Sequence, residues 1–136
     1  MKRIKSALIS VSDKSNLEPL LKVLKKNKIK LISSGGTYKA IKKLKYKCLD
    51  VSDFTGAKEI LSGRVKTLHP KIYAGVLNIR KNKTHLKEMK LENFENIDLV
   101  IVNFYQFERA LAKTKSVNKI VDYIDWSPFF HAWELR

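Results

Sequence analysis

The sequence has few of the residues that mark several large classes of protein. It has a single cysteine, Cys48, so no disulfide can form within the chain, which is typical of a reducing compartment. Its three prolines and five glycines do not gather into a linker or a low-complexity tract. No apolar run approaches the roughly 20 residues needed to cross a bilayer. These absences argue against a disulfide-rich domain, a low-complexity chain and a transmembrane protein.

Acidic residues are also scarce, with 13 Asp and Glu against 28 Lys and Arg, for a net charge of +15. Such an excess occurs in proteins that bind nucleic acid, an anionic membrane surface or an acidic substrate. Lysine far outnumbers arginine here, and the lysines lie on the polar side of segments such as "LKVLKKNKIK". Interfaces that read bases favour arginine forks and interleaved aromatics. We therefore expect solvated lysine faces, no specific nucleic-acid partner and no membrane partner, with a field that attracts a phosphorylated substrate.

The rest of the composition is that of a globular protein with one domain. The chain has 136 residues, of which 44% are hydrophobic and 30% charged. Its start is basic and then apolar, like a signal peptide, but the apolar run alternates and leads into "SVSDK" without a small-residue cleavage site. We therefore expect a cytoplasmic protein that begins with a strand. Cys48, beside Leu49, is expected to be a small core residue.

Strand and helix patterns alternate over the first half of the chain. Leucines at i, i+3, i+4 and i+7 predict one face of a helix. Alternation of this kind predicts an α/β fold with a parallel sheet and right-handed crossovers. The strand segments are "IKSALISV" (4–11), "IKLISS" (29–34) and "YKCLDV" (46–51), and the helical ones are the face of Leu17, Leu20, Leu21 and Leu24 and "TYKAIKKL" (37–44).

The second half begins with a long irregular segment, "SDFTGAKEILSGRVKTLHP" (52–70), of a kind that is more often functional than idle. "KIYAGVLNI" (71–79) predicts a further strand and "KTHLKEMKLENF" (83–94) an exposed helix. The continuous apolar run "IDLVIVNFY" (97–105) predicts a strand buried on both faces. A last helix is predicted from Val117, Ile120, Val121 and Ile124, with Ser116 as its N-cap.

Three predicted loops should meet at one edge of the sheet, because ligands of open α/β sheets bind beyond the carboxyl ends of the strands. They are "SVSDK", "SSGGT" and "NFYQF". In "SSGGT", Gly35 and Gly36 let backbone N–H groups approach a ligand, and the following helix start favours an anion. Ser34 and Thr37 add hydroxyl donors. An ordinary strand-to-helix turn, with Thr37 as N-cap, explains this segment equally well.

The neighbouring loops offer cations. Ser12 and Lys14 could reach the same anion, although helix capping by Asp13 explains that loop equally well. In "GRVKTLHP" (63–70), Arg64 has a planar fork for phosphate and Lys66 a compact charge, unless this is an ordinary basic surface loop.

Histidine and cysteine give no stronger candidates for chemistry. His69 is interpreted as holding its loop through a hydrogen bond, in preference to acting as an acid or base. Neither residue type has the spacing of metal ligands, so no metal is expected.

Four segments together carry a resemblance to a known family. "LISVSDKSNL", "LISSGGTYKAI", "VSDFTGAKEILSGRVKTLHPKIYAGVL" and "IDLVIVNFYQFE" resemble the N-terminal domain of the bifunctional AICAR transformylase/IMP cyclohydrolase family of purine biosynthesis. The similarity runs from about Ile4 to about Ile124, and "GRVKTLHP" is its most specific motif. It implies a methylglyoxal synthase-like, three-layer α/β domain with a mainly parallel central sheet over residues 1–124, followed by a divergent tail, residues 125–136.

The resemblance also implies an activity and a site. The activity is IMP cyclohydrolase, which closes the second purine ring of formyl-AICAR with loss of water and needs no metal or redox cofactor. Lys66 would lie near the reacting formyl group, and Tyr105 would position and polarise the formyl oxygen. The residues implied as catalytic are Lys66, Tyr105 and Asp125, and those implied for substrate binding are Ser12, Lys14, Ser34, Gly35, Gly36, Thr37, Arg64, Thr67 and Asn103.

The chain departs from the family near its end. Asp125 can be aligned, but the two glycines and the later lysine of the family are missing, as is a transformylase domain. Gln106 stands where the family usually has proline. The tail "DYIDWSPFFHAWEL" resembles a segment of the activation domain of cobalamin-dependent methionine synthase, but it is too short to form a ligand pocket. We therefore expect a truncated domain whose end has been replaced.

Several functions stay open at this point. The first is an IMP cyclohydrolase acting on a small nucleotide, and the alternative is a catalytically silent nucleotide- or phosphate-binding module of the same fold. A methylglyoxal synthase is disfavoured by "GRVKTLHP" and "NFYQF", and nucleic-acid binding is supported by charge alone. The full-length family is dimeric, so the resemblance is compatible with a homodimer.

Overall fold

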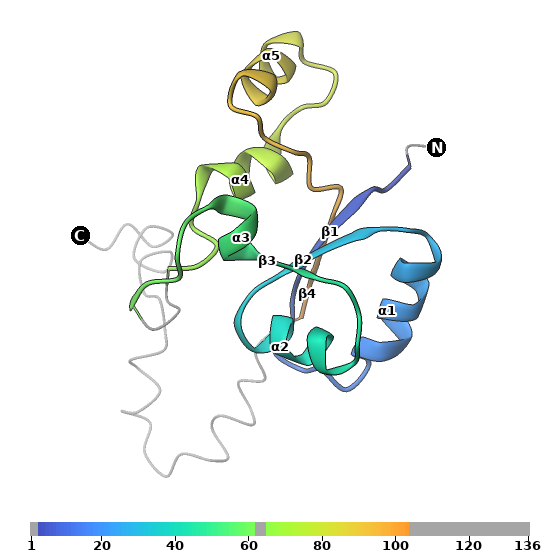
Figure 1. Ribbon diagram of the computed structural model, residues 1–136. Helices are drawn as coiled ribbons and strands as arrows, with labels where there is room; N and C mark the ends of the chain where they lie inside the picture. Colours follow the sequence, from blue (N-terminus) through green and yellow to red (C-terminus); the bar gives the residue numbers. More distant parts are fainter. Residues whose placement is uncertain (1–2, 62–64, 104–136) are drawn as a thin grey trace, which may run out of the picture. The chain divides into compact units, whose positions relative to one another are not determined.

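The computed structural model describes residues 3–61 and 65–103, and within them a parallel four-stranded sheet has helices on both faces (Figure 1). The strand order is β3-β2-β1-β4, and all three neighbouring pairs are parallel. The strands are β1 (Ser6–Ser10), β2 (Lys30–Ser33), β3 (Leu49–Asp50) and β4 (Leu99–Val102). The helices are α1 (Leu17–Lys26), α2 (Gly35–Lys43), α3 (Val51–Thr55), α4 (Pro70–Leu77) and α5 (Lys83–Leu91).

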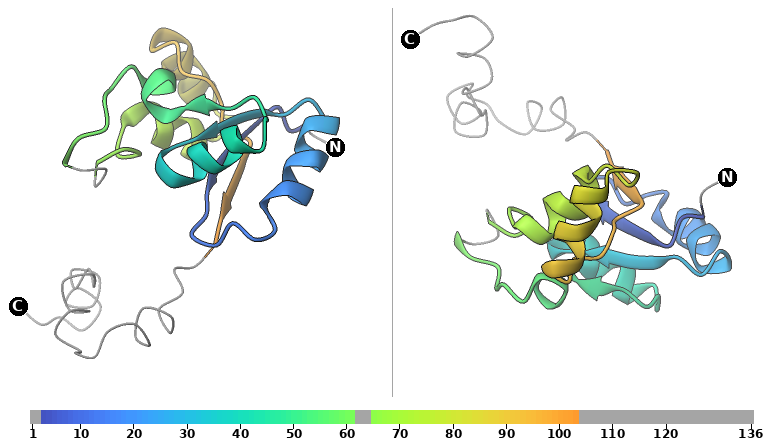
Figure 2. Two further views of the ribbon diagram at one scale, coloured as in Figure 1. Left: turned by 60° about the horizontal axis from the view of Figure 1, so that its bottom comes forward. Right: turned by 90° about the horizontal axis from the view of Figure 1, so that it is seen from above.

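Alternation along the central strands divides the core into two halves. Ala7 and Ile9 of β1 belong to a cluster with α1 and α2, whereas Leu8 belongs to a cluster with α3 and α4. In the ribbon views of Figure 2, α1 (blue) and α4 (yellow-green) lie on opposite sides of the sheet. This arrangement of helix layer, sheet and helix layer confirms the predicted three-layer α/β fold. The first cluster contains Ala7, Ile9, Leu17, Leu21, Leu24, Leu31 and Ile41, and the second Leu8, Ile32, Val51, Phe54, Ile72 and Ile97.

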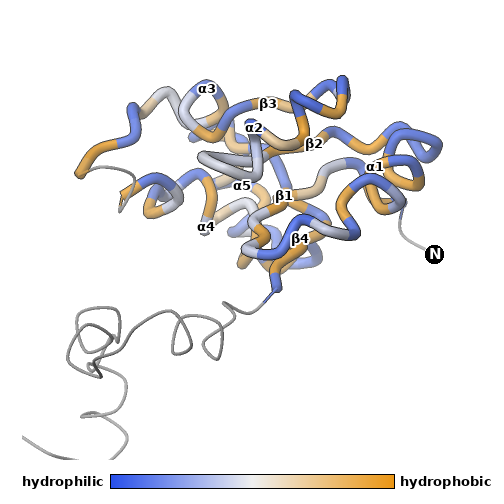
Figure 3. The backbone as a smooth tube through the Cα atoms, turned by 90° about the horizontal axis from the view of Figure 1, so that it is seen from below, coloured by the Kyte–Doolittle hydropathy of each residue, from blue (hydrophilic) through white to orange (hydrophobic). Residues whose placement is uncertain are grey.

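Helix α1 forms where the leucine spacing predicts it. Leu17, Leu21 and Leu24 are buried and Leu20 is half-buried, so the helix turns one apolar stripe toward the sheet. Its turns alternate between hydrophobic and hydrophilic along the tube in Figure 3. Burial of each such leucine stabilises the fold by about 1.5–3 kcal/mol. The lysines of α1 lie on its solvent side, as expected from the sequence.

Helix α4 corrects the prediction of a strand over residues 71–79. Pro70 occupies the first turn of the helix, where its missing N–H costs nothing. His69 is the N-cap, and its Nδ1 accepts a hydrogen bond from the Lys71 N–H at 3.1 Å, which confirms the structural role predicted for this histidine. The apolar residues that predicted a strand belong to this helix instead, and its buried residues are Ile72 and Gly75. A Cβ atom at Gly75 would lie 2.9 Å from the Glu95 carbonyl oxygen, so glycine permits this close approach.

Two strands also differ from their predictions. β4 is at an edge of the described sheet, and Val100 and Val102 are 43% and 66% exposed, so the prediction of burial on both faces is wrong there. β3 has two residues because the chain turns at once into α3. The Asp50 carboxylate caps that helix by accepting from the Ser52 N–H at 2.9 Å.

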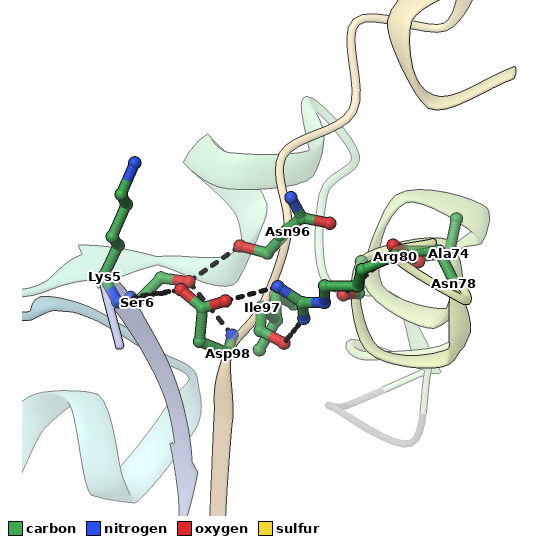
Figure 4. A network of polar contacts seen from close by, with 9 residues as sticks. Lys5, Ser6, Ala74, Asn78, Arg80, Asn96, Ile97 and Asp98 are labelled. Atoms are coloured by element: carbon green, nitrogen blue, oxygen red, sulfur yellow. Dashed lines mark hydrogen bonds and ion pairs between the residues drawn. The ribbon is translucent and has the colours of Figure 1, made fainter. Parts of the chain in front are cut away.

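A polar network joins the start of β1 to the start of β4, away from the carboxyl ends of the strands (Figure 4). The Asp98 carboxylate accepts from the Lys5 N–H at 2.8 Å and forms an ion pair with Arg80. Arg80 also donates from Nη2 to the Ile97 carbonyl at 2.8 Å. Burial alone would raise the pKa of Asp98, but the hydrogen bonds from Lys5 and Arg80 outweigh it, so this pKa lies below its ordinary value. The network fixes the register in which β4 enters the sheet.

Several predictions concern the last part of the chain. The helix over residues 117–124 with its cap Ser116, the boundary between residues 124 and 125, and the tail after it lie outside the described residues. Among the helices that the structure does describe, none has the length and apolar character required to cross a membrane.

Candidate anion-binding site

The carboxyl ends of β1, β2 and β4 lie at one edge of the sheet, on the side from which Figure 3 is viewed. The last residue pairs are Ile9 with Ser33 and Ser10 with Val102. The three loops that follow therefore start next to one another, as the parallel arrangement predicts. This edge is the place where a ligand site is expected in an α/β sheet.

The loop after β2 leads directly into the first turn of α2. Ser34 is the extended N-cap, with φ −137° and ψ 165°, so the alternative in which Thr37 caps the helix is wrong. Gly35 has φ +54°, a conformation that glycine adopts without strain. The first turn of α2 contains no acidic residue, and Ser34 makes no side-chain capping bond. Since first-turn N–H groups have no partner within a helix, this end of α2 favours an anion.

Two lysines from other loops lie over the two glycines. A Cβ atom at Gly35 would be 3.2 Å from Lys66 Nζ, and one at Gly36 would be 3.8 Å from Lys14 Cε and 4.0 Å from Lys14 Nζ. Lys66 lies before α4, whereas Lys14 follows β1, and both side chains are exposed. Two ammonium groups therefore meet at the start of α2, where a doubly charged anion would be matched by charge and by backbone donors.

The loop after β1 is held by hydrogen bonds from two sides. On one side, the buried Thr37 hydroxyl accepts from the Val11 N–H at 3.2 Å and donates to the Val11 carbonyl at 3.0 Å. On the other side, Asn103 Oδ1 accepts from the N–H groups of Ser12 and Asp13 at 2.6 and 3.3 Å. Asn103 Nδ2 donates to the Asp13 carbonyl at 2.8 Å. No sequence motif indicates these hydrogen bonds, because they join residues far apart in the chain that only the fold brings together.

Asp13 itself has a role other than the capping considered from the sequence. The N-cap of α1 is Asn16, and Asp13 Oδ1 accepts from the Ser15 N–H at 2.9 Å within the loop. Lys14 is tied to the same loop, because its Nζ donates to the Ser12 carbonyl at 3.0 Å.

Most of the residues predicted for the site lie around this edge. Thr67 is half-buried, and its carbonyl accepts from the His69 N–H at 2.9 Å. Arg64, Tyr105 and Asp125 lie outside the described residues. Residues 3–61 and 65–103 contain no group of three or more His, Cys, Asp or Glu side chains that could hold a metal ion. The predicted residues that the structure brings together are Ser12, Lys14, Ser34, Gly35, Gly36, Thr37, Lys66 and Asn103.

These features define a class: a three-layer α/β domain in which two lysine side chains lie over the start of a helix at the carboxyl edge of a parallel sheet. A family model described as "MGS-like domain" matches residues 16–125, and the chain belongs to that family.

Curated relatives and a solved structure agree with this assignment. The chain is 43% identical over 123 residues to the "Bifunctional purine biosynthesis protein PurH" of Acetivibrio thermocellus, covering 90% of this chain and 24% of the relative. The protein of the same name from Ruminiclostridium cellulolyticum is 48% identical over 110 residues, covering 81% of this chain and 21% of the relative. The structure titled "Crystal structure of ForH" has a TM-score of 0.67 at 33% identity, covering 75% of this chain and 53% of that one. The chain thus spans about a quarter of the length of these curated relatives.

Proposed function

We propose that this chain carries IMP cyclohydrolase activity and closes the second ring of formyl-AICAR to give IMP. The observation that carries the proposal is the meeting of Lys14 and Lys66 over the glycines at the start of α2. A nucleotide 5′-phosphate is a dianion of the kind that such a helix start and two ammonium groups bind. The printed name of the relatives, a bifunctional purine biosynthesis protein, supports a purine nucleotide as the ligand.

In this proposal the phosphate and ribose end of the substrate lies at the loops after β1 and β2. The N–H groups of Gly35 and Gly36 face the phosphate, and Lys14 neutralises part of its charge. Ser12 and Ser34 supply hydroxyl groups beside it, and Ser34 is 8% exposed with no capping bond of its own. Thr37 and Asn103 belong to the same substrate end.

The chemical step requires a carboxamide nitrogen to attack the formyl carbon of the same molecule. A C–N bond forms, and the formyl oxygen leaves as water with one proton from the carboxamide nitrogen and one from the formamido nitrogen. Because both groups already belong to one molecule, holding them in a reactive geometry supplies only part of the roughly 7–11 kcal/mol that is gained when two separate reactants are brought together. Charge that grows on the formyl oxygen is stabilised by Lys66 and the Tyr105 hydroxyl. By the resemblance, Arg64 and Thr67 line the site and Asp125 completes the catalytic set.

The proposal is tested by mixing the purified chain with formyl-AICAR and following IMP by chromatography. We expect turnover, with losses of about 100-fold or more for Lys66→Ala and for Tyr105→Phe, since removing one donor to a developing oxyanion has effects of this size. Lys87→Ala, an exposed lysine on α5, is the matched control and should not change the rate. IMP binding without turnover would identify a silent nucleotide-binding module instead. DNA binding that weakens with salt, with no nucleotide affinity, would support the charge-based interpretation.

The remaining parts of the proposal concern partners and location. We propose a nucleotide as the only small-molecule partner, a homodimer, a cytoplasmic location and a domain boundary after residue 124. A mass measured by light scattering at twice the 15.7 kDa of the chain would support the dimer.

A further inference from the structure

We propose that Thr37 and Asn103 are positioning residues that clamp the loop after β1 and thereby place Lys14 over the start of α2. This inference rests on the proposed function, because Lys14 is taken as a phosphate ligand there. It assigns the two residues a role that needs no contact with the ligand. The loop they hold, residues 11–13, is called the clamped loop below.

Thr37 acts as a substitute for a strand partner. Pairing between β1 and β2 ends at Ile9 and Ser33, so β2 leaves the backbone of Val11 without a ladder partner. The Thr37 hydroxyl accepts from the Val11 N–H and donates to the Val11 carbonyl, at 3.2 and 3.0 Å. A hydroxyl has one proton to donate, and here it is directed to Val11. The 5% exposure of Thr37 agrees with a role inside the domain.

Asn103 also substitutes for a strand partner, on the other side of β1. Pairing between β1 and β4 ends at Ser10 and Val102, and Asn103 is the next residue of the chain. Its amide is both acceptor and donor, like a peptide group, and it bonds the N–H groups of Ser12 and Asp13 and the carbonyl of Asp13. The clamped loop is therefore hydrogen-bonded from both neighbouring elements after the regular sheet has ended.

This clamp determines where Lys14 begins and where its ammonium group is held. Lys14 is the residue after the clamped loop, and its Nζ donates to the Ser12 carbonyl within that loop at 3.0 Å. A free lysine side chain has many accessible rotamers, and part of this conformational entropy is lost when it binds a ligand. Fixing both the backbone and the contact of Nζ reduces that loss at the moment of binding.

A double-mutant cycle separates positioning through Lys14 from a general effect on the fold. The measured quantity is the dissociation constant for IMP, and inorganic phosphate is a second probe, both by calorimetry on the full chain. Thr37→Val removes the hydroxyl at nearly constant volume, whereas Thr37→Ser keeps it. We expect Thr37→Val and Asn103→Ala each to weaken binding about 10-fold and Thr37→Ser to retain wild-type affinity, since about 1.4 kcal/mol corresponds to tenfold. In a Lys14→Ala background, Thr37→Val and Asn103→Ala should each weaken binding by less than about twofold. The effects of substitutions at coupled residues do not add, and both residues are proposed to act through Lys14.

Amide hydrogen exchange tests the clamp without any ligand. Thr37→Val should accelerate exchange at the Val11 amide, and Asn103→Ala at the amides of Ser12 and Asp13. Unfolding midpoints of the same variants exclude loss of the whole fold as the cause.

Each of four results would overturn the inference, the proposed function or both. A full tenfold loss that persists in the Lys14→Ala background overturns the inference, as does faster exchange with unchanged affinity for both probes. Phosphate binding with no IMP binding overturns the proposed function, and the cycle is then decided with phosphate. A folded chain that binds neither probe overturns both.

Discussion

Lys66 Nζ lies 3.2 Å from the position that a Cβ atom at Gly35 would occupy, and this contact joins the loop before α4 to the start of α2. Gly35 is also at φ +54°, where residues with a side chain are strained. The cation and the glycine therefore share one small space, which is the core of the candidate site.

The two neighbouring glycines should respond differently to alanine. Gly35→Ala places a side chain at positive φ and against Lys66, so it should lower the free energy of unfolding by about 1–2 kcal/mol. Gly36→Ala meets Lys14 Cε at 3.8 Å, an ordinary contact, and the preference of a helix for alanine should leave stability unchanged or raise it by up to about 1 kcal/mol. Urea denaturation of both variants measures the difference. Equal effects would mean that the left-handed backbone at Gly35 is not required.

Gly75 is a glycine of a different kind, because it lies inside α4. Alanine is favoured over glycine in a helix by about 0.5–1 kcal/mol, so propensity alone predicts that Gly75→Ala stabilises the domain. A Cβ atom there would lie 2.9 Å from the Glu95 carbonyl oxygen and 3.1 Å from Ile97 Cγ1. We expect the steric term to dominate and to destabilise the fold by about 1–3 kcal/mol in thermal or urea unfolding. A stabilised variant would show that α4 is free to move away from residues 95–97.

The ion pair of Asp98 with Arg80 should make stability depend on pH. Asp98→Asn should cost about 1–3 kcal/mol near neutral pH, because it leaves the half-buried Arg80 without its countercharge. Glu95→Gln, which breaks the more exposed pair with Lys30, should cost less than about 1 kcal/mol.

The direction of the pH effect follows from the lowered pKa of Asp98, whose favourable hydrogen bonds outweigh the cost of its burial. The contribution of the carboxylate is complete above its unfolded pKa of about 3.9 and is lost as the pH falls through the lower, folded pKa. The stability gap between wild type and Asp98→Asn should therefore narrow as the pH falls below about 4. If the difference in free energy of unfolding between wild type and Asp98→Asn stayed constant down to the acid transition, the ion pair of Asp98 with Arg80 would not be its cause.

Cys48 should react slowly with alkylating reagents in the folded protein. Burial, aided by the charge of Asp50, raises the pKa of its thiol to about 11 from a reference of 9.0. The thiolate fraction at pH 8 is then about 100-fold lower than in the unfolded chain, and the rate with iodoacetamide should fall by a similar factor. The same reaction in urea supplies the reference rate. Equal rates in the two states would place the thiol in water.

The sequence predicted the sheet better than its connections. β1, β2 and α1 formed where alternation and leucine spacing predicted them, because one or both faces of each are buried against the core. The helix α4 was mistaken for a strand, since Ile72 and Tyr73 have strand propensity and tertiary packing overrides it. The signal that could have corrected this is the His69–Pro70 pair, an N-cap followed by a first-turn proline.

For the site, the sequence predicted which loops meet but not how they are joined. Parallel order alone placed Lys14, Gly36 and Asn103 at one edge, and the described contacts confirm that placement. The bonds from Thr37 and Asn103 to the loop after β1 depend on distances between elements far apart in the chain. Hydrophobic periodicity carries no information on such distances, so these bonds could not be predicted.

The start of α2 is proposed to bind the substrate phosphate, and calorimetry with IMP and with inosine tests this role directly. Inosine has the same base and sugar but no phosphate, so we expect it to bind at least about 100-fold more weakly, the equivalent of about 2.7 kcal/mol. Lys14→Ala or Lys66→Ala should remove most of this preference for IMP over inosine. In NMR spectra of isotope-labelled protein, IMP should shift the amide signals of Gly35 and Gly36. Equal affinities for IMP and inosine, or IMP binding that leaves both glycine amides unchanged, would contradict the account.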